Sequence, residues 1–226
     1  MQVDNGTIHV DGENPKNVLA AARAPSERTV ILLVAAVQFV NILDFMMVMP
    51  LGPDFAKALA IPTAHIGYIG GAYTLAAAIA GMIGSLFLDR FDRRKALAVA
   101  MLGLVAATAL GGFSVGLNSL IGARLLAGAF GGPATAVALA IVSDVVPPER
   151  RGRALGTVMT AFSVASILGV PAGLRVGTLF GWRAPFFAVA SLGVLVTVAA
   201  VFACRRSRGT ARASANAAPR RSSSIG

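Results

Sequence analysis

The sequence predicts an all-α membrane protein with six transmembrane helices, and three observations support this fold class. Of the 226 residues, 56% are hydrophobic and only 13% are charged, whereas about 25% of the residues of soluble domains are charged. Six apolar runs are each long enough to cross the hydrocarbon core of a bilayer, which takes roughly 20 helical residues. The charged residues lie mostly between these runs, as expected for helices embedded in lipid.

The six predicted helices follow one another through most of the chain, at residues 30–50, 66–88, 96–115, 120–146, 154–176 and 184–204. The connectors are short, so sequential helices should be antiparallel neighbours. Residues 1–29 are polar and carry no long apolar run, which predicts a cytoplasmic tail. Residues 205–226 are rich in Ser, Ala and Arg, a composition that predicts a basic, disordered cytoplasmic tail.

The distribution of Lys and Arg predicts the orientation, because these residues collect in cytoplasmic loops. The two tails and the connectors at 89–95 and 147–153 hold sixteen of them, whereas the alternate connectors hold three, counting Arg175 with Arg183. Both termini should therefore be cytoplasmic, with the bundle integral to the cell membrane. The basic residues that produce the net charge of +10 flank the spans and do not interleave with aromatic residues, so no nucleic-acid partner is expected.

The connector after the second span is densely charged, with the sequence FLDRFDRRKAL at residues 87–97. A signal for membrane orientation accounts for Arg94. It does not account for Asp89 at the end of the second span or Asp144 in the last turn of the fourth, because carboxylates contribute little to orientation. Both acids are predicted on the cytoplasmic side together with Arg93, so the three side chains can form an acid–base–acid cluster.

This connector resembles the signature of the major facilitator superfamily, which reads roughly G-x-L-a-D-r-x-G-r-k. The matching residues are Asp89, Arg90, Arg93 and Arg94, while Ser85 and Asp92 replace the two glycines and Phe87 replaces the leucine. In place of the second glycine, Asp92 can adopt a left-handed backbone or cap the third helix. The resemblance implies that Asp89, Arg93 and Asp144 form a conformational latch.

Four later segments resemble the same family in the family's own order. They are RLLAGAFGG at 124–132, SDVVPPERRGRALG at 143–156, GVPAG at 169–173 and FGWRAPF at 180–186. GVPAG looks like the glycine–proline motif of antiporters, although its residues stand in a different order. The resemblance covers residues 30–204 and implies the N-terminal six-helix half of a major facilitator fold.

Several glycines are spaced four residues apart, a pattern that lets membrane helices approach closely. The candidate packing residues are Gly67 with Gly71, Gly128 with Gly132, and Gly169 with Gly173, the last pair enclosing Pro171. Close helix contacts of this kind are compatible with a bundle that moves.

Two ionisable residues, Asp44 and Arg124, lie clearly inside predicted spans and not in the last turn, where a charge costs about 2.5–3.5 kcal/mol and is a functional candidate by default. They are predicted at similar depth below the outer surface. Gln38 and Asn41 precede Asp44 at steps of three, so this polar stripe should face the interior of the bundle. The resemblance implies that the first and fourth helices line a central cavity, which would bring Asp44 and Arg124 together.

Two interpretations of this pair stay open. One is a structural ion pair that neutralises two buried charges. The other is proton coupling, since burial favours the neutral carboxyl and a nearby guanidinium favours the carboxylate, and the balance can change as the site alternates access. Further polar candidates for lining the cavity are Tyr73, Thr74 and Ser163.

The sequence does not predict an enzyme. GFSVG at residues 112–116 fits the nucleophile pattern G-x-S-x-G, but that motif works on a strand-to-helix turn, and here it closes a membrane helix. The two histidines, His9 and His65, lie in the tail and the first outer connector. No metal-ligand cluster and no phosphate-binding loop is present in the sequence, so neither a metal nor another cofactor is expected.

The resemblance implies transmembrane transport, in the form of proton-coupled efflux of a drug-like or sugar-like small molecule by an antiporter. Members of the family hold their substrate between two six-helix halves, and this chain resembles one half. The expected partners are therefore the lipid bilayer, a small-molecule substrate, and a second six-helix half or a second copy. The other interpretation is a truncated or non-transporting membrane protein derived from such a carrier.

Overall fold

The computed structural model describes residues 27–87 and 92–216, and the side chains of 27–85 and 92–201. These residues form helices joined by short turns, without a strand in the described ranges. Six helical segments are long and apolar enough to cross a membrane: Glu27–Met47, Thr63–Ser85, Arg93–Gly112, Leu117–Val145, Pro148–Phe180 and Ala184–Val201. Each overlaps one predicted run, so the predicted class of a six-helix membrane protein is confirmed.

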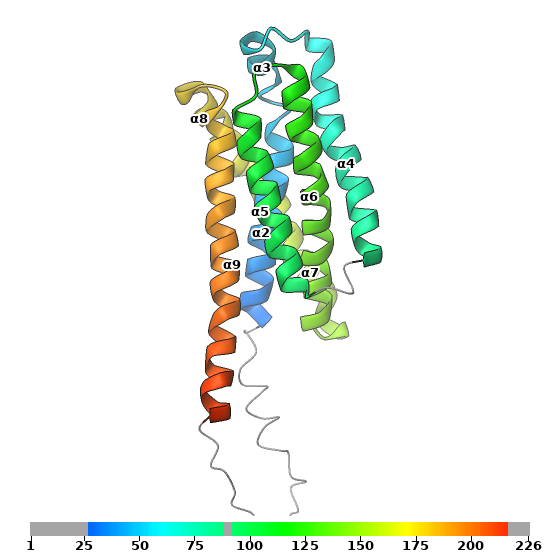
Figure 1. Cartoon of the computed structure of the whole chain (residues 1–226), viewed down its shortest axis with the longest axis vertical. Coiled ribbons are helices and arrows are strands. Elements are labelled where there is room, and N and C mark those ends of the chain that lie inside the picture. The colour runs from blue at the N-terminus through cyan, green and yellow to red at the C-terminus, as the bar shows by residue number, and fades with distance from the viewer. Residues whose placement is uncertain (1–26, 88–91, 217–226) are drawn as a thin grey trace, which may run out of the picture. The chain divides into compact units, whose positions relative to one another are not determined.

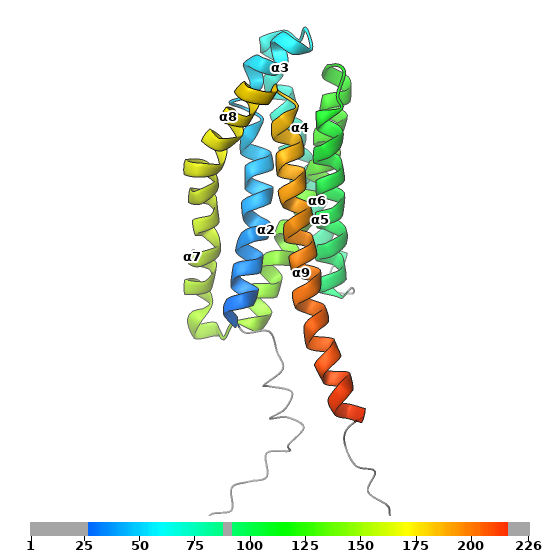
Figure 2. The same ribbon diagram turned by 90° about the vertical axis from the view of Figure 1, so that its left-hand side faces the viewer.

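The helices that build these spans are α2 (Glu27–Met47), α4 (Ile66–Phe87), α5 (Arg93–Gly112), α6 (Leu117–Val145), α7 (Pro148–Val164), α8 (Val170–Phe180) and α9 (Ala184–Asn216). Helix α6 packs against α4, α5 and α2, and α2 also packs against α7. Figures 1 and 2 show these helices side by side along the bundle. Helix α6 is therefore a common neighbour of α2, α4, α5 and α7.

Helices α4 and α6 approach closely because two α6 glycines lie at their contact. A methyl group on Gly128 would collide with the backbone carbonyl of Tyr73, and one on Gly132 would collide with that of Ala77. Of the other predicted packing pairs, Gly169 and Gly173 face Leu43 and Met47 of α2, respectively. Gly67 and Gly71 differ, since no atom of the described residues lies within 4 Å of a Cβ added at either position.

The fifth span is one continuous helical rod with a change of pitch. A π-helical segment, η3 (Ala165–Gly169), joins α7 to α8, and Pro171 lies in the first turn of α8. Proline has no backbone N–H and clashes with the carbonyl four residues earlier, and a π-helical turn relieves that clash by inserting one residue. The glycine–proline segment thus changes the local geometry without ending the span.

The connector between the first two spans is partly helical. It contains α3 (Gly52–Ala58) and the 3-10 turn η1 (Thr63–His65). Phe55 of α3 is fully buried, and its ring lies 5.7 Å from the rings of both Trp182 and Phe186. This aromatic cluster ties the first connector to the beginning of α9.

The last helix corrects one sequence-based prediction. Residues 205–226 were predicted to be disordered, but α9 continues through 205–216 and ends at Asn216, while residues 217–226 of that prediction lie outside the described residues. The sequence RRSRGTARASAN at 205–216 is rich in alanine and arginine, which have high helix propensity, and no proline occurs before Pro219. The apolar part of the helix therefore extends into a polar helical segment.

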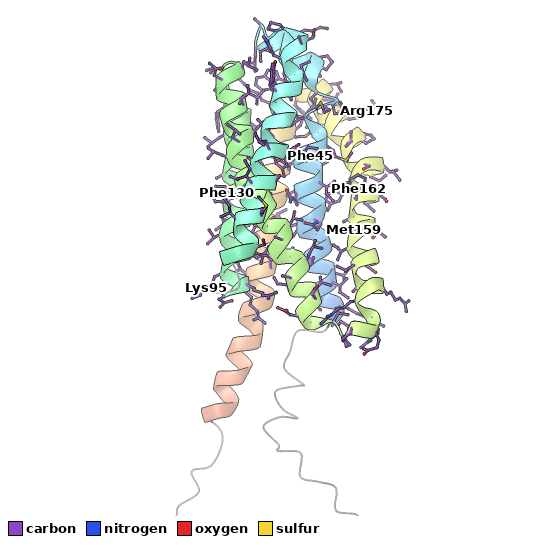
Figure 3. All side chains as sticks on the ribbon, turned by 90° about the vertical axis from the view of Figure 1, so that its right-hand side faces the viewer. Phe45, Lys95, Phe130, Met159, Phe162 and Arg175 are labelled. Carbon is purple, nitrogen blue, oxygen red and sulfur yellow. The ribbon has the colours of Figure 1, made fainter. Side chains whose placement is uncertain are left out.

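Large apolar side chains cover the outside of the bundle. Leu75, Leu102 and Leu195 are each more than half exposed, a pattern suited to contact with lipid and not with water. Lys95 lies at one end of the bundle and Arg175 toward the other (Figure 3). The chain is an integral membrane protein whose apolar surface lies between two charged ends.

We expect Gly128→Ala to destabilise the bundle by about 1–3 kcal/mol, because the added methyl group forces α4 away from α6. Gly122→Ala is the matched control, since it lies on the same helix and its Cβ would meet nothing within 4 Å. Unfolding of the purified variants in detergent provides the measurement. Equal stability of the two variants would contradict the close α4–α6 contact.

Candidate functional site

The centre of the candidate site is an ion pair between two fully buried side chains. Nη1 of Arg124, on α6, lies 3.1 Å from Oδ2 of Asp44, on α2, and both side chains have zero exposure. The same Nη1 also donates to the backbone carbonyl oxygen of Asp44 at 3.4 Å. The structure thus brings together the two ionisable residues that the sequence placed inside the spans.

A third helix contributes a hydroxyl group to this pair. Oγ1 of Thr108, on α5, lies 2.9 Å from Oδ1 of Asp44 and 2.8 Å from the carbonyl oxygen of Leu104. Thr108 is 1% exposed. The two carboxylate oxygens of Asp44 therefore have different partners, a guanidinium on α6 and a hydroxyl on α5.

The other edge of the Arg124 guanidinium is not hydrogen-bonded. Nε and Nη2 are buried and have no hydrogen-bond partner among the described residues. The guanidinium carbon lies 5.2 Å from the centroid of the Phe186 ring, in a cation–π contact. Gly111 provides the room for this arrangement, because a Cβ there would lie 3.3 Å from Nη2 and 3.0 Å from the Phe186 ring.

A second polar network lies one helical turn before Asp44 on α2. Nδ2 of Asn41 donates to the carbonyl oxygen of Gly131 at 3.0 Å and to Oγ1 of Thr135 at 2.6 Å. The hydroxyl of Tyr73, on α4, donates to Oδ1 of Asn41 at 2.5 Å. Asn41 therefore connects α2 with α4 and α6, and the buried amide is satisfied on both its oxygen and its nitrogen.

The remaining cavity candidates lie apart from this network. Gln38 is buried on α2, and its Oε1 has no partner among the described residues. Thr74 is exposed and bonds only its own helix, donating to the carbonyl oxygen of Gly70 at 3.1 Å. Ser163 is exposed on α7. The polar network contains Asn41 and Tyr73, and a cavity-lining role stays a prediction for these two residues as well as for Gln38, Thr74 and Ser163.

The structure joins two of the three predicted latch residues. Nη1 of Arg93, at the start of α5, lies 2.8 Å from Oδ2 of Asp144, near the end of α6, with the two side chains 33% and 53% exposed. Asp89 lies outside the described residues. Asp92 caps α5 by accepting from the backbone N–H of Arg94 at 3.1 Å, and its φ of −57° is not left-handed.

Sequence reasoning missed a second ion pair at this end of the bundle. Nη2 of Arg150, in the first turn of α7, lies 3.2 Å from Oε2 of Glu27 on α2. Both residues belong to segments interpreted only as a polar tail and a basic connector. Their separation in the chain, more than a hundred residues, left no local signal for the pairing.

The sequence also missed Thr108, Thr135, Gly111 and Gly131 as members of the site. Thr108 carried a usable signal, since it is the one polar side chain in the run ALAVAMLGLVAATALGG at residues 96–112. A lone hydroxyl inside a span often hydrogen-bonds another helix. The glycines carried no such signal, because their importance depends on which side chain of another helix lies against them.

Two features considered in the sequence, a metal-ligand cluster and a serine nucleophile, can be examined in the described residues. No group of three or more His, Cys, Asp or Glu side chains there could hold a metal ion. Ser114 of the GFSVG segment is buried, and within the described part of the chain its hydroxyl has no hydrogen-bond partner, histidine or otherwise. A serine nucleophile needs a base within hydrogen-bond distance.

Comparison with known proteins identifies similar sequences among membrane carriers. The family model described as Major Facilitator Superfamily matches residues 34–225. The chloramphenicol resistance protein of Streptomyces lividans is 31% identical over 159 residues, which cover 70% of this chain and 40% of the relative. Multidrug resistance protein 2 of Bacillus subtilis (strain 168) is 25% identical over 181 residues, covering 80% of this chain and 45% of the relative.

Solved structures share the fold at lower identity. The inward-open xylose transporter XylE from E. coli has a TM-score of 0.69 at 15% identity, with 78% of this chain and 47% of that chain covered. A bacterial homologue of the human lysosomal transporter Spinster, inward-facing and unoccupied, has a TM-score of 0.67 at 20% identity, covering 80% and 43%. The chain thus spans less than half the length of each of these four proteins.

We expect Arg124→Met to destabilise the bundle by about 3–5 kcal/mol, because it leaves the Asp44 carboxylate buried without its counter-ion. The double variant Asp44→Leu/Arg124→Met removes both charges and should recover most of that loss. The free energy of unfolding, measured in detergent for both variants and for Asp44→Leu alone, gives the coupling between the two sites. Additive losses would mean that the two side chains do not interact energetically.

Proposed function

The chain belongs to the Major Facilitator Superfamily, and we propose that its six-helix bundle is one half of a proton-coupled carrier that exports a small drug-like molecule. Members of this fold hold their substrate near the middle of the bilayer between two six-helix halves. The proposed assembly therefore needs a second half, supplied by another chain segment or by a second copy. The proposed location is the cell membrane, with both ends of the bundle's chain on the cytoplasmic side.

The observation that carries this proposal is the fully buried pair of Asp44 and Arg124. A buried ion pair is seldom more stable than well-packed apolar residues of similar size, so stability alone is a weak reason for its presence. A purely structural pair is also expected to satisfy its hydrogen-bonding groups. Nε and Nη2 of Arg124 have no partner in the described residues, so these two donors are available to other groups, as the proposed role requires.

The proposed coupling follows from the protonation of Asp44. As a carboxylate, Asp44 accepts from Arg124 and holds α6 against α2. When Asp44 takes up a proton it becomes neutral and its attraction for the guanidinium falls, so α2 and α6 are less strongly held together. Alternating access to the two sides of the membrane would then load the proton on one side and release it on the other.

The proposed substrate class rests on the surroundings of this pair and on the named relatives. Phe45, which is labelled in Figure 3, is next to Asp44 on α2 and is 40% exposed. Its ring lies 5.3 Å from that of Tyr73. A partly exposed aromatic ring beside a buried tyrosine suits an apolar small molecule that carries a few polar groups. The resistance proteins from Streptomyces and Bacillus support a drug-like substrate, and the xylose transporter makes a sugar the alternative to test.

We expect Asp44→Asn to abolish export driven by a pH gradient while leaving membrane insertion intact, because an amide cannot exchange the proton. The measurement is accumulation of labelled chloramphenicol, with xylose as the alternative probe, in inverted vesicles that contain the assembled carrier. Asp54→Asn is the matched control, since Asp54 is an exposed acid of α3. Undiminished gradient-driven export by Asp44→Asn would remove Asp44 as the proton carrier, and export by a strictly monomeric chain would contradict the two-half assembly.

We expect Arg93→Ala to loosen the cytoplasmic end of the bundle, because it removes the ion pair that joins α5 to Asp144 of α6. Loss of stability should be small, since exposed ion pairs are worth about 0–1 kcal/mol. The measurement is the labelling rate of Leu97→Cys, a position that is 9% exposed one turn after Arg93, in a background with Cys204→Ala. Arg94→Ala is the control and should have little effect. Similar labelling rates in the two variants would contradict the latch role of Arg93 and leave this connector only the role of orienting the chain in the membrane.

A further inference from the structure

Thr108 is a candidate for a specific part in the proposed proton exchange, because its hydroxyl faces two acceptors at once. Its Oγ1 lies 2.9 Å from Oδ1 of Asp44 and 2.8 Å from the carbonyl oxygen of Leu104. A threonine hydroxyl carries a single hydrogen and two lone pairs. It can therefore donate to only one of these two oxygens at a time. Which oxygen accepts depends on whether Asp44 is protonated.

We propose that Thr108 is a positioning residue that satisfies Asp44 in both of its protonation states. When Asp44 is a carboxylate, the Thr108 hydroxyl donates its hydrogen to Oδ1. When a proton binds to Oδ1, the new O–H of Asp44 donates to Oγ1 of Thr108, and the Thr108 hydrogen is donated to the carbonyl oxygen of Leu104. This proposal rests on the proposed function of Asp44 as a proton carrier.

The geometry allows this exchange without a change of side-chain rotamer. Both acceptors already lie within 3 Å of Oγ1, so only the hydroxyl hydrogen has to rotate. The Leu104 carbonyl has a second lone pair available beside the one used by the helix. Both side chains of the ion pair have zero exposure, so a carboxyl oxygen without a hydrogen-bond partner there is unfavourable, and Thr108 provides a partner in each protonation state.

The other groups around Asp44 do not both donate to its carboxylate and accept from its protonated form. Arg124 of α6 is a donor only, so it can bond the carboxylate but cannot accept from a protonated carboxyl. Tyr73 of α4, the other titratable group near Asp44, uses its hydroxyl to donate to Asn41. No other Lys, Arg or His of the described residues forms an ion pair with Asp44, from α5, η3, α8 or α9. Thr108 is thus the amphiprotic partner at the site.

The test compares three variants by infrared spectroscopy of the purified chain across a pH titration. Thr108→Val removes the hydroxyl at nearly constant shape, and Thr108→Ser retains it. Thr197→Val is the matched control, because Thr197 is also buried (4% exposed) and donates to its own helix at Gly193, 2.7 Å away, without an acidic partner. The probe is the carbonyl stretching band of protonated Asp44, identified by its loss in Asp44→Asn.

We expect the Asp44 band to move to higher frequency in Thr108→Val, because the carboxyl loses a hydrogen-bond partner, and the pH midpoint of its titration to move as well. In Thr108→Ser and Thr197→Val both quantities should match the original chain. An unchanged band and midpoint in Thr108→Val, or an equal shift in Thr197→Val, overturns the role of Thr108 while leaving Asp44 as a titrating group. Absence of any titrating Asp44 band in the original chain overturns the proton-carrier proposal itself, and the role of Thr108 with it.

Discussion

The ion pair between Asp44 and Arg124 constrains the interior of this bundle more than any other contact. Both side chains have zero exposure in this structure, and the hydrocarbon around a span offers no alternative partner for either charge. Helices α2 and α6 must therefore lie next to each other at this depth. Thr108 and Phe186 complete the surroundings of the pair, and through them α5 and α9 are fixed against the same two helices.

Helix α6 can serve as the common neighbour because its faces differ in size and polarity. Gly128 and Gly132 give one face a smooth surface on which the backbone of α4 rests, while Phe130 projects into the space left by Gly103 of α5. Arg124 supplies the charge that meets α2. Without a hydrophobic driving force between helices in lipid, close packing and interhelical polar contacts are what hold such a bundle together. The glycines, the phenylalanine and the arginine of this one helix thus determine its contacts with α4, α5 and α2, respectively.

The two kinds of ion pair in the bundle have different physical consequences. The Arg93–Asp144 and Arg150–Glu27 pairs lie at the helix ends and are partly exposed, so water and salt weaken them and they can open at little cost. The Asp44–Arg124 pair is buried, and separating its charges is expensive unless the carboxylate is neutralised first. Under the proposed function, the carrier would open easily at its ends and would change its interior only when a proton binds to Asp44.

The sequence by itself determined the fold class, the six spans and the two buried charges. These properties depend on the length and composition of the apolar runs, because the thickness of the bilayer sets how many apolar residues a spanning helix needs. It also identified the Arg93–Asp144 pair, because both residues lie at span ends on one side. It did not determine the helical extension of α9 to Asn216, which depends on local propensity in a segment too polar for a membrane pattern.

Only the tertiary structure decided the partners of Asp44, Arg124 and Asn41, and the importance of Gly111 and Gly131, because a side chain's contacts depend on how each helix is rotated and how closely it packs. Those two variables are set by all neighbouring helices together, and no single segment of the sequence contains them.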